Sequence, residues 1–237
     1  MRPLVIVPTF NERDNLPRLL PQLLAIPDLL ILVVDDASHD GTAELADLAA
    51  AQNPDRVSVL HRRGARGLGR SYIDGMRLAL ATNADVICQM DADLSHLPSE
   101  LHRLLAATAD ADLVIGSRYV HGGRIENWPR RRMLLSAFAN HYVRLITRLS
   151  PHDVTSGFRA WRRDLLFRIP LADLGVEGYA FQVEMTWRAR HAGARIVEVP
   201  ITFVERREGK SKLSWRVILE SIVHPWQLVL ARNSRPM

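Results

Sequence analysis

Short apolar runs that alternate with helix-like segments constrain the fold of this chain more than any other feature of its sequence. The run Leu29–Val34 is apolar without alternation, which is typical of a strand covered on both faces of a sheet. Comparable runs occur at Leu4–Val7, Val57–Leu60, Ala84–Cys88 and Leu113–Ile115. Between the first two runs, leucines recur at helical spacing from Leu16 to Leu24. The alternation predicts an α/β protein with a mainly parallel central sheet flanked by helices.

Two aspartates, Asp91 and Asp93, follow the fourth predicted strand, at the edge where an open parallel sheet places its ligand crevice. Because alternate residues of an extended chain point the same way, both carboxylates can converge on one cation. A hard divalent ion such as Mg²⁺ uses few carboxylates and completes its shell with substrate phosphates. The structural alternative is that the pair caps the helix that begins near Pro98. The Asp-x-Asp motif alone leaves both interpretations open.

Polar loops also follow the first two predicted strands. Residues 8–12 follow the first strand, and Asp35 and Asp36 follow the second. We expect these loops to meet the aspartate pair at one edge of the sheet. The glycine-rich loop Gly64–Gly69 could cradle phosphates or form a turn between strand and helix. It does not follow a first strand, so it does not match a dinucleotide-binding fingerprint.

The formal net charge of +5 hides an asymmetry between the two halves of the chain. Residues 1–117 carry 10 Arg against 16 Asp and Glu, whereas residues 118–237 carry 21 Lys and Arg against 10 Asp and Glu. A basic second half suits nucleic acid, an anionic membrane surface or a phosphorylated substrate. The single Cys88 excludes an internal disulfide framework and fits a reducing compartment. No apolar stretch reaches the roughly 18 residues of a membrane span.

The second half of the chain is less regular than the first. Residues Gly122–Trp128 are predicted to form a loop, and Met133–Leu149 a helix that lies in a membrane interface or packs on the core. Next along the chain, the sequence predicts a turn-rich strand over Asp153–Arg159, a helix from Glu177 to Arg190 and a strand over Ile196–Glu205. A basic loop over Arg206–Lys212 and a helix over Trp215–Leu230 are predicted to follow, and Pro225 should interrupt that helix. No internal repeat or domain linker separates the two halves.

Several short motifs occur together in one order. They are the segments 89–98 (QMDADLSHLP), 116–119 (GSRY), 127–129 (NWP), 157–159 (GFR), 181–185 (FQVEM) and 211–212 (SK). With the three polar loops, they resemble the inverting family-2 glycosyltransferases of the GT-A fold, and among these the polyprenyl- or dolichyl-phosphate mannosyltransferases (dolichol-phosphate-mannose synthases). The resemblance covers about residues 3–215. It implies a single GT-A domain over residues 1–237, with a nucleotide-sugar-binding half (1–117) and an acceptor-binding half (118–237) that carries amphipathic interfacial helices.

The resemblance also implies roles for individual residues at matching positions. The implied donor-binding residues are Pro8, Phe10, Glu12, Val34, Asp36, Asp91, Ala92, Asp93, Arg206 and Lys212. A Mg²⁺ or Mn²⁺ ion is expected on Asp91, Asp93 and Ser95. The acceptor's phosphate is expected on Arg118, Arg132 and Ser136. The catalytic residues would be Asp91, Asp93 and Arg118. Phe10 replaces a tyrosine that is common in the family, and Ser95 replaces the glutamine of some members.

The implied activity is inverting, metal-dependent transfer of mannose from GDP-mannose to polyprenyl (dolichyl) phosphate, which gives a β-linked product. One alternative keeps this mechanism with another donor, for example UDP-glucose, and another is a sugar-nucleotide-binding, membrane-associated protein without catalysis. The acidic first half and the metal-type aspartate pair argue against a nucleic-acid-binding function. The protein is expected to be peripheral at the cytoplasmic face of the membrane, without a membrane span. It would attach directly or through a membrane-anchoring partner subunit.

Overall fold

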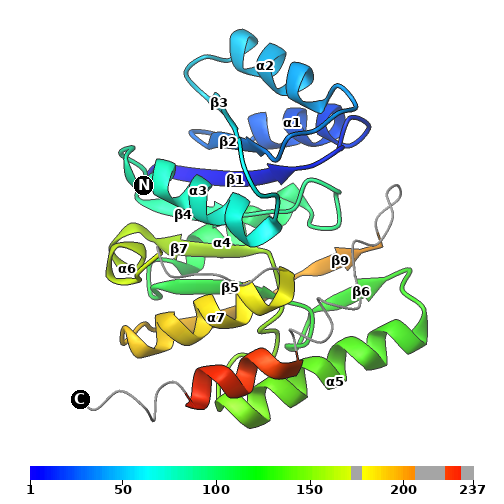
Figure 1. Ribbon diagram of the computed structural model, residues 1–237, viewed down its shortest axis with the longest axis vertical. Helices are drawn as coiled ribbons and strands as arrows, with labels where there is room; N and C mark the ends of the chain where they lie inside the picture. Colours follow the sequence, from blue (N-terminus) through cyan, green and yellow to red (C-terminus); the bar gives the residue numbers. More distant parts are fainter. Residues whose placement is uncertain (172–177, 206–221, 231–237) are drawn as a thin grey trace.

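A computed structural model describes residues 1–171, 178–205 and 222–230 of the chain (Figure 1). Its centre is a seven-stranded sheet in the order β3-β2-β1-β4-β7-β5-β8. These strands are β1 (Pro3–Thr9), β2 (Leu30–Asp35), β3 (Val57–His61), β4 (Val86–Gln89), β5 (Leu113–Ser117), β7 (Arg159–Arg162) and β8 (Ile196–Pro200). Strands β3, β2, β1 and β4 pair in parallel, with Leu4 opposite Leu30. The predicted, mainly parallel sheet is confirmed.

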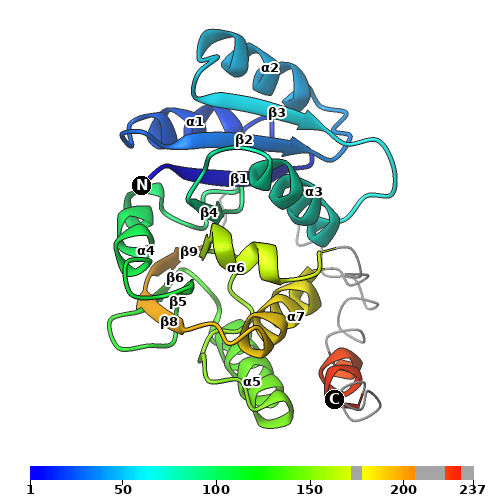
Figure 2. The same cartoon turned by 90° about the vertical axis from the view of Figure 1, so that its left-hand side faces the viewer.

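Helices cover both faces of this sheet (Figure 2). One face packs against α1 (Leu16–Leu24), α2 (Thr42–Gln52) and, after the short 3-10 helix η1 (Pro98–Glu100), α4 (Leu101–Ala107). The other face packs against α3 (Leu68–Leu80), α6 (Arg163–Arg168) and α7 (Gly178–His191). Strand β2 directs Ile31 and Val33 into the first core and Leu32 and Val34 into the second. Burial on both faces is why its sequence is apolar without alternation.

Strand β7 runs antiparallel to both of its neighbours, β4 and β5. The sequence predicts a turn-rich strand over Asp153–Arg159, but the strand begins only at Arg159 and residues 153–158 form the loop before it. The buried Arg159 side chain donates hydrogen bonds to the backbone oxygens of Val154 and Ser156. These bonds give two carbonyl groups of the loop hydrogen-bond partners in place of those that a neighbouring strand would provide.

A second, two-stranded sheet joins β6 (Arg124–Glu126) to β9 (Thr202–Val204). The prediction that Gly122–Trp128 is only a loop is therefore wrong, and the predicted strand Ile196–Glu205 is divided between two sheets. The division falls at Ile201, whose N–H still donates to the carbonyl of Ser117 at the end of β5. The pairing of β6 with β9 is a contact between residues distant in sequence, so no local pattern in residues 122–128 could indicate it.

Helix α5 (Arg130–Thr147) begins three residues before the predicted start at Met133. Residues 222–230 form a helical segment beside it, joined by a hydrogen bond from Trp226 Nε1 to the Tyr142 hydroxyl at 3.0 Å. This segment is the last part of the predicted helix Trp215–Leu230. Residues 206–221, which include the predicted basic loop, lie outside the described residues. In the part of the chain that the structure describes, no helix is long and apolar enough to cross a bilayer.

Candidate active site

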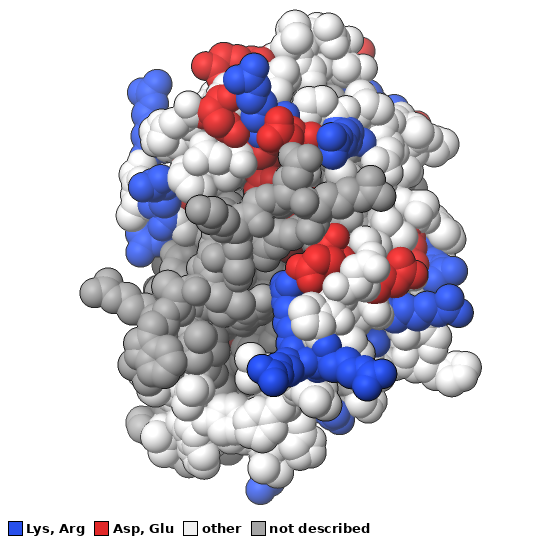
Figure 3. Space-filling view, turned by 90° about the vertical axis from the view of Figure 1, so that its right-hand side faces the viewer, with Lys and Arg blue, Asp and Glu red and all other residues white. Residues whose placement is uncertain are grey.

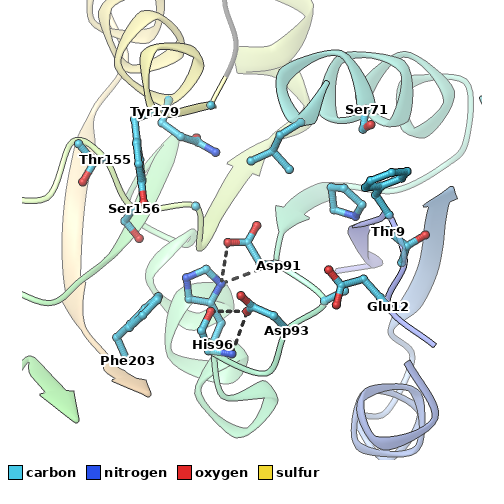
Figure 4. Close-up of a pocket in the computed structure, with 18 of the residues that line it drawn as sticks. Thr9, Glu12, Ser71, Asp91, Asp93, His96, Thr155, Ser156, Tyr179 and Phe203 are labelled. Atoms are coloured by element: carbon cyan, nitrogen blue, oxygen red, sulfur yellow. Dashed lines mark hydrogen bonds and ion pairs between the residues drawn. The ribbon is translucent and has the colours of Figure 1, made fainter. Parts of the chain in front are cut away.

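A pocket of about 460 Å³ opens at the carboxyl ends of the parallel strands (Figure 4). The predicted site residues that line it are Pro8, Phe10, Glu12, Asp36, Asp91, Ala92, Asp93, Ser95, Arg118 and Arg132. Val34 does not line the pocket, because its side chain is buried in the core against α3. Ser136 lies on α5, one turn beyond Arg132, and is also outside the lining. Arg206 and Lys212 lie outside the described residues.

Asp91 is held from two sides. The hydroxyl of Tyr72, a fully buried residue of α3, donates to Asp91 Oδ1 at 2.9 Å. The backbone N–H of Asp91 donates to His96 Nδ1 at 3.4 Å, which places the proton of the neutral imidazole on Nε2. Burial lowers the pKa of His96 and outweighs the opposing effect of Asp91 and Asp93. Burial and the nearby Asp91 raise the pKa of Tyr72, so Tyr72 remains a hydroxyl donor.

Asp93 is oriented by the residue two positions after it. The backbone N–H of Ser95 donates to Asp93 Oδ1 at 3.1 Å, and the Ser95 hydroxyl donates to the same oxygen at 2.5 Å. Figure 4 shows Asp91 and Asp93 next to each other beside His96, both in the pocket. Among the described residues, no group of three His, Cys, Asp or Glu side chains could hold a metal ion. The oxygen atoms of the two carboxylates are the kind of ligand that a hard divalent ion prefers, and such an ion usually takes further ligands from substrate and water.

Contacts among the strand-end loops hold the side of the pocket that residues 8–12 and Asp36 form. Asp36 forms an ion pair with Arg62 and accepts a hydrogen bond from the N–H of Gly67 at 2.8 Å. These bonds attach the glycine-rich loop to the end of β2. The guanidinium of Arg66, from the same loop, lies 4.7 Å from the centroid of the Phe10 ring. The ring of Phe10 thus provides a packing surface without a hydroxyl group.

Arg118 and Asp153 form a buried ion pair on the other side of the pocket. Arg118 Nε and Nη2 donate to the two oxygens of Asp153 at 2.7 and 2.6 Å, and Nη2 also donates to Thr155 Oγ1 at 3.0 Å. Arg118 is 8% exposed and Asp153 is 0% exposed. Burial by itself would lower the pKa of Arg118, but the Asp153 carboxylate raises it above its ordinary value. Arg118 is therefore a permanent cation.

Arg132 lies in the same corner of the pocket as Arg118. Its guanidinium is 4.0 Å from the centroid of the Trp128 ring and forms an ion pair with Glu205. Arg118 is 5.6 Å from the same ring. The indole N–H of Trp128 is buried and has no hydrogen-bond partner among the described residues. Two guanidinium groups and an unpartnered N–H make this corner suited to an anion.

The remaining residues of the pocket lining are not among the predicted site residues, although Arg66, Gly67 and Leu68 belong to the glycine-rich loop. They are Thr9, Arg66, Gly67, Leu68, Ser71, His96, Trp128, Thr155, Ser156, Gly157, Gly178, Tyr179, Gln182 and Phe203. Figure 4 shows Thr155, Ser156 and Tyr179 across the aspartate pair from Thr9 and Glu12. His96 and Trp128 lie inside the quoted motifs, so the motifs could have indicated that these two residues belong to the site. Tyr72 carries no such signal, because it occupies an ordinary core position of α3.

Two other carboxylates have structural roles. Asp35 accepts a hydrogen bond from the N–H of Ser38 at 3.1 Å and stabilises the turn after β2. Glu184, on α7, pairs with Arg188 at 2.5 Å and lies 3.1 Å from His224. Neither residue lines the pocket.

Helix α5 presents an apolar face to solvent at the lower end of the molecule in Figure 1. Its most exposed apolar side chains, each 66–72% exposed, are Leu134, Leu135, Phe138 and Leu145. In Figure 3 the part of this lower end that is drawn in white or colour is largely uncharged, and Arg side chains lie just above it. Arg130 and Arg131 are exposed at the start of the helix. An apolar patch with a basic rim indicates an interaction surface rather than ordinary solvent-exposed structure.

The model of glycosyl transferase family 2 matches residues 4–169, well over half of the chain, and the chain belongs to this family of enzymes. One relative is the polyprenol monophosphomannose synthase of Mycolicibacterium smegmatis, which is 51% identical over 223 residues, covering 93% of this chain and 84% of the relative. Another is the undecaprenyl-phosphate mannosyltransferase of Micrococcus luteus, which is 50% identical over 225 residues, covering 94% of this chain and 92% of the relative. Both relatives carry names of mannosyl-transferring enzymes.

Solved structures show the same fold at lower sequence identity. The mannosyl-3-phosphoglycerate synthase from Rubrobacter xylanophilus aligns with a TM-score of 0.71 at 19% identity, over 100% of this chain and 76% of that chain. The mannosyltransferase PcManGT from Pyrobaculum calidifontis, in complex with GDP-Man and Mn²⁺, aligns with a TM-score of 0.65 at 20% identity. That alignment covers 97% of this chain and 64% of PcManGT, so this chain spans just under two thirds of it. The expected GT-A fold is confirmed.

Proposed function

We propose that this chain transfers mannose from GDP-mannose to polyprenyl (dolichyl) phosphate, with inversion at the anomeric carbon. The observation that carries the proposal is that one pocket holds both a carboxylate pair, Asp91 and Asp93, and a guanidinium pair, Arg118 and Arg132. The names of the two relatives support a mannosyl group and a polyprenyl phosphate acceptor. The complex of PcManGT with GDP-Man and Mn²⁺ indicates that a protein of this fold accommodates such a donor.

On the donor side, Asp91 and Asp93 would hold a Mg²⁺ or Mn²⁺ ion, with Ser95 orienting Asp93. Such an ion supplies positive charge next to the departing nucleoside diphosphate. The residues proposed to bind the nucleotide from the strand-end loops are Pro8, Phe10, Glu12, Asp36 and Ala92. Val34 can contribute only through its backbone, because its side chain is in the core. Arg206 and Lys212 are proposed to reach the diphosphate.

On the acceptor side, Arg118 and Arg132 would bind the phosphate, with Ser136 on the next turn of α5. A phosphate monoester has a second pKa of about 6 and is largely a dianion at pH 7. It is already a nucleophile, so no general base is needed. The two arginines would align it for attack on the anomeric carbon from the side opposite the diphosphate. That direction of attack inverts the configuration and gives a β-linked product from an α-linked donor. The first half of the chain would thus bind the donor and the second half the acceptor.

The lipid acceptor also implies contact with a membrane. We propose that the apolar face of α5 and the exposed side chains of residues 222–230 lie in the interface of the cytoplasmic leaflet, as a peripheral attachment. Arg130 and Arg131, at the start of α5, would attract anionic headgroups. A membrane-anchoring partner subunit is the alternative means of attachment.

The proposed function is tested by transfer of radiolabelled sugar to a short polyprenyl phosphate, with GDP-mannose or UDP-glucose as the donor and with or without Mg²⁺ or Mn²⁺. We expect product from GDP-mannose only, and loss of product when a chelator removes the metal. Turnover of UDP-glucose alone would contradict the mannose assignment. Absence of product from both donors would favour a sugar-nucleotide-binding protein without catalysis.

A further inference from the structure

Asp153 contacts Arg118 at three nitrogen atoms. Asp153 Oδ2 accepts hydrogen bonds from the backbone N–H of Arg118 at 3.0 Å and from Nε at 2.7 Å, and Oδ1 accepts one from Nη2 at 2.6 Å. The Arg118 side chain is therefore held at both its base and its tip. Among the described residues, Nη1 of Arg118 makes no hydrogen bond. One edge of the guanidinium is occupied by Asp153, and Nη1 remains for a ligand in the pocket that Arg118 lines.

Asp153 is itself held in place by contacts with three parts of the fold. Its backbone N–H donates to Glu198 Oε1, on β8, at 2.9 Å. The Thr155 hydroxyl, which accepts from Arg118 Nη2, donates to Asp153 Oδ1 at 3.3 Å. Asn140, on α5, donates to the same hydroxyl at 3.1 Å. Strand β8, helix α5 and the loop before β7 thus hold the pair in one arrangement without any acceptor bound.

Aromatic rings restrict the guanidinium further. The centroids of Tyr119 and Phe203 both lie 5.3 Å from Arg118 Cζ, and that of Trp128 lies at 5.6 Å. Stacking on rings limits rotation of a planar guanidinium, while the bidentate carboxylate fixes its direction in the plane. The position and the direction of Arg118 are therefore both determined before a ligand enters.

We infer that Asp153 is a positioning residue, which holds Arg118 so that Nη1 is presented to the phosphate of the acceptor. The inference rests on the proposed function, in which Arg118 binds that phosphate. Asp153 does not line the pocket, so its proposed effect on the acceptor is exerted through Arg118. A phosphate that meets an arginine already in place does not have to order it, which favours both binding and alignment for attack.

Positioning and simple electrostatics predict opposite effects of removing the Asp153 charge. Asp153 is an anion beside a site for an anion, so by charge alone it opposes the phosphate. If charge were its only effect, Asp153→Asn would lower the KM for polyprenyl phosphate. If Asp153 positions Arg118, the same substitution raises that KM, because one of the two strong contacts to the guanidinium is lost and its direction is no longer fixed.

The test compares Asp153→Asn with the wild-type enzyme in steady-state transfer from GDP-mannose to a short polyprenyl phosphate. We expect the acceptor KM to rise by about tenfold or more, with the KM for GDP-mannose within about twofold of wild type. Glu184→Gln is the matched control, because it also neutralises a buried carboxylate paired with an arginine but lies outside the pocket. It should change neither KM. An unchanged or lower acceptor KM in Asp153→Asn, or an equal rise in both KM values, would overturn the inference.

Removing one partner of a buried ion pair can also prevent folding. The pair Thr155→Val and Thr155→Ser keeps the inference testable in that case, because serine retains the hydroxyl that joins Arg118 to Asp153 and valine does not. We expect a rise of about twofold to fivefold in the acceptor KM for Thr155→Val and none for Thr155→Ser. A wild-type acceptor KM in Thr155→Val would overturn the inference. Failure of the wild-type chain to use polyprenyl phosphate at all would instead overturn the proposed function, and the inference with it.

Discussion

At the scale of single residues, hydroxyl groups set the directions of the Asp91 and Asp93 carboxylates. Ser95 donates to Asp93, and Tyr72 donates to Asp91. A hydroxyl that donates to a carboxylate fixes the direction of the carboxylate. Unlike a guanidinium, the hydroxyl carries no positive charge. These two contacts orient the carboxylate oxygens that would bind a divalent ion. The arginines of the pocket are arranged differently, because Arg118 and Arg132 each face a carboxylate of their own.

Asp93→Ala removes one of the two proposed metal ligands. We expect transfer to fall on the order of 100-fold or more, because the departing diphosphate loses its counter-charge. The thermal unfolding midpoint and binding to vesicles should stay at wild-type values, since Asp93 belongs to neither the core nor the apolar face of α5. Wild-type transfer by this variant would exclude Asp93 from the donor site.

Tyr72→Phe removes only the hydroxyl that orients Asp91. Because partners of metal ligands typically contribute 10-fold to 100-fold to affinity, we expect Mn²⁺ binding in the presence of GDP to weaken by about tenfold. Titration calorimetry measures this independently of turnover. Tyr142→Phe is the control, since the Tyr142 hydroxyl bonds to Trp226 and the carbonyl of Ile222 and not to the pocket. Equal Mn²⁺ affinity in the two variants would show that the Tyr72 hydroxyl has no role in the metal site.

At the scale of elements, the close approach of α3 to the sheet depends on Gly75. A Cβ at this position would lie 2.7 Å from Ile6 Cγ2 and 3.1 Å from Val34 Cγ2. These contacts leave no space for a methyl group unless the helix moves away from β1 and β2. Since α3 also carries Tyr72, its distance from the sheet helps to place the Tyr72 hydroxyl at Asp91.

Gly75→Ala should therefore lower the free energy of unfolding by about 1–3 kcal/mol, the usual cost of overpacking a core. Urea denaturation monitored by circular dichroism measures the change. Helix propensity predicts the opposite sign, because alanine in a helix interior is favoured over glycine by about 0.5–1 kcal/mol. A gain of that size would mean that the helix shifts at no cost.

At the scale of the whole molecule, one end of the pocket and the apolar face of α5 belong to the same half of the chain. Arg132 lines the pocket, and Leu134, Leu135 and Phe138 follow it within two turns of the same helix. A lipid whose phosphate reaches Arg132 would have its chain close to this apolar face. Under the proposed function, a single helix would thereby serve both membrane attachment and acceptor binding.

Replacing Leu134, Leu135 and Phe138 by serine should reduce flotation with anionic vesicles by at least about tenfold, because three exposed apolar side chains no longer enter the interface. The matched control replaces two leucines and a phenylalanine exposed on other helices, Leu48, Leu78 and Phe167, and should float as the wild type does. Transfer to a water-soluble short acceptor should remain in both variants. Absence of vesicle binding by the wild-type chain would favour a membrane-anchoring partner subunit.

The sequence by itself determined the features that repeat or lie close together along the chain. Strands buried on both faces are mainly apolar, so β1, β2 and β4 could be predicted from continuous apolar runs in the sequence. The meeting of three polar loops at one edge followed from parallel pairing. The Asp-x-Asp pair and the arginine positions followed from short motifs, and the pocket contains most of them.

Only the tertiary structure decided which side chains act on these residues. Tyr72 meets Asp91 across 19 positions, and Asp153 meets Arg118 across 35, and neither contact has a periodic signal in the sequence. The antiparallel insertion of β7 and the pairing of β6 with β9 are of the same kind. Val34 is the opposite case. The motif match predicted that Val34 binds the donor, but its side chain is buried in the core and does not line the pocket. Local patterns specify which groups are present at the sheet edge, and long-range packing specifies their partners and directions.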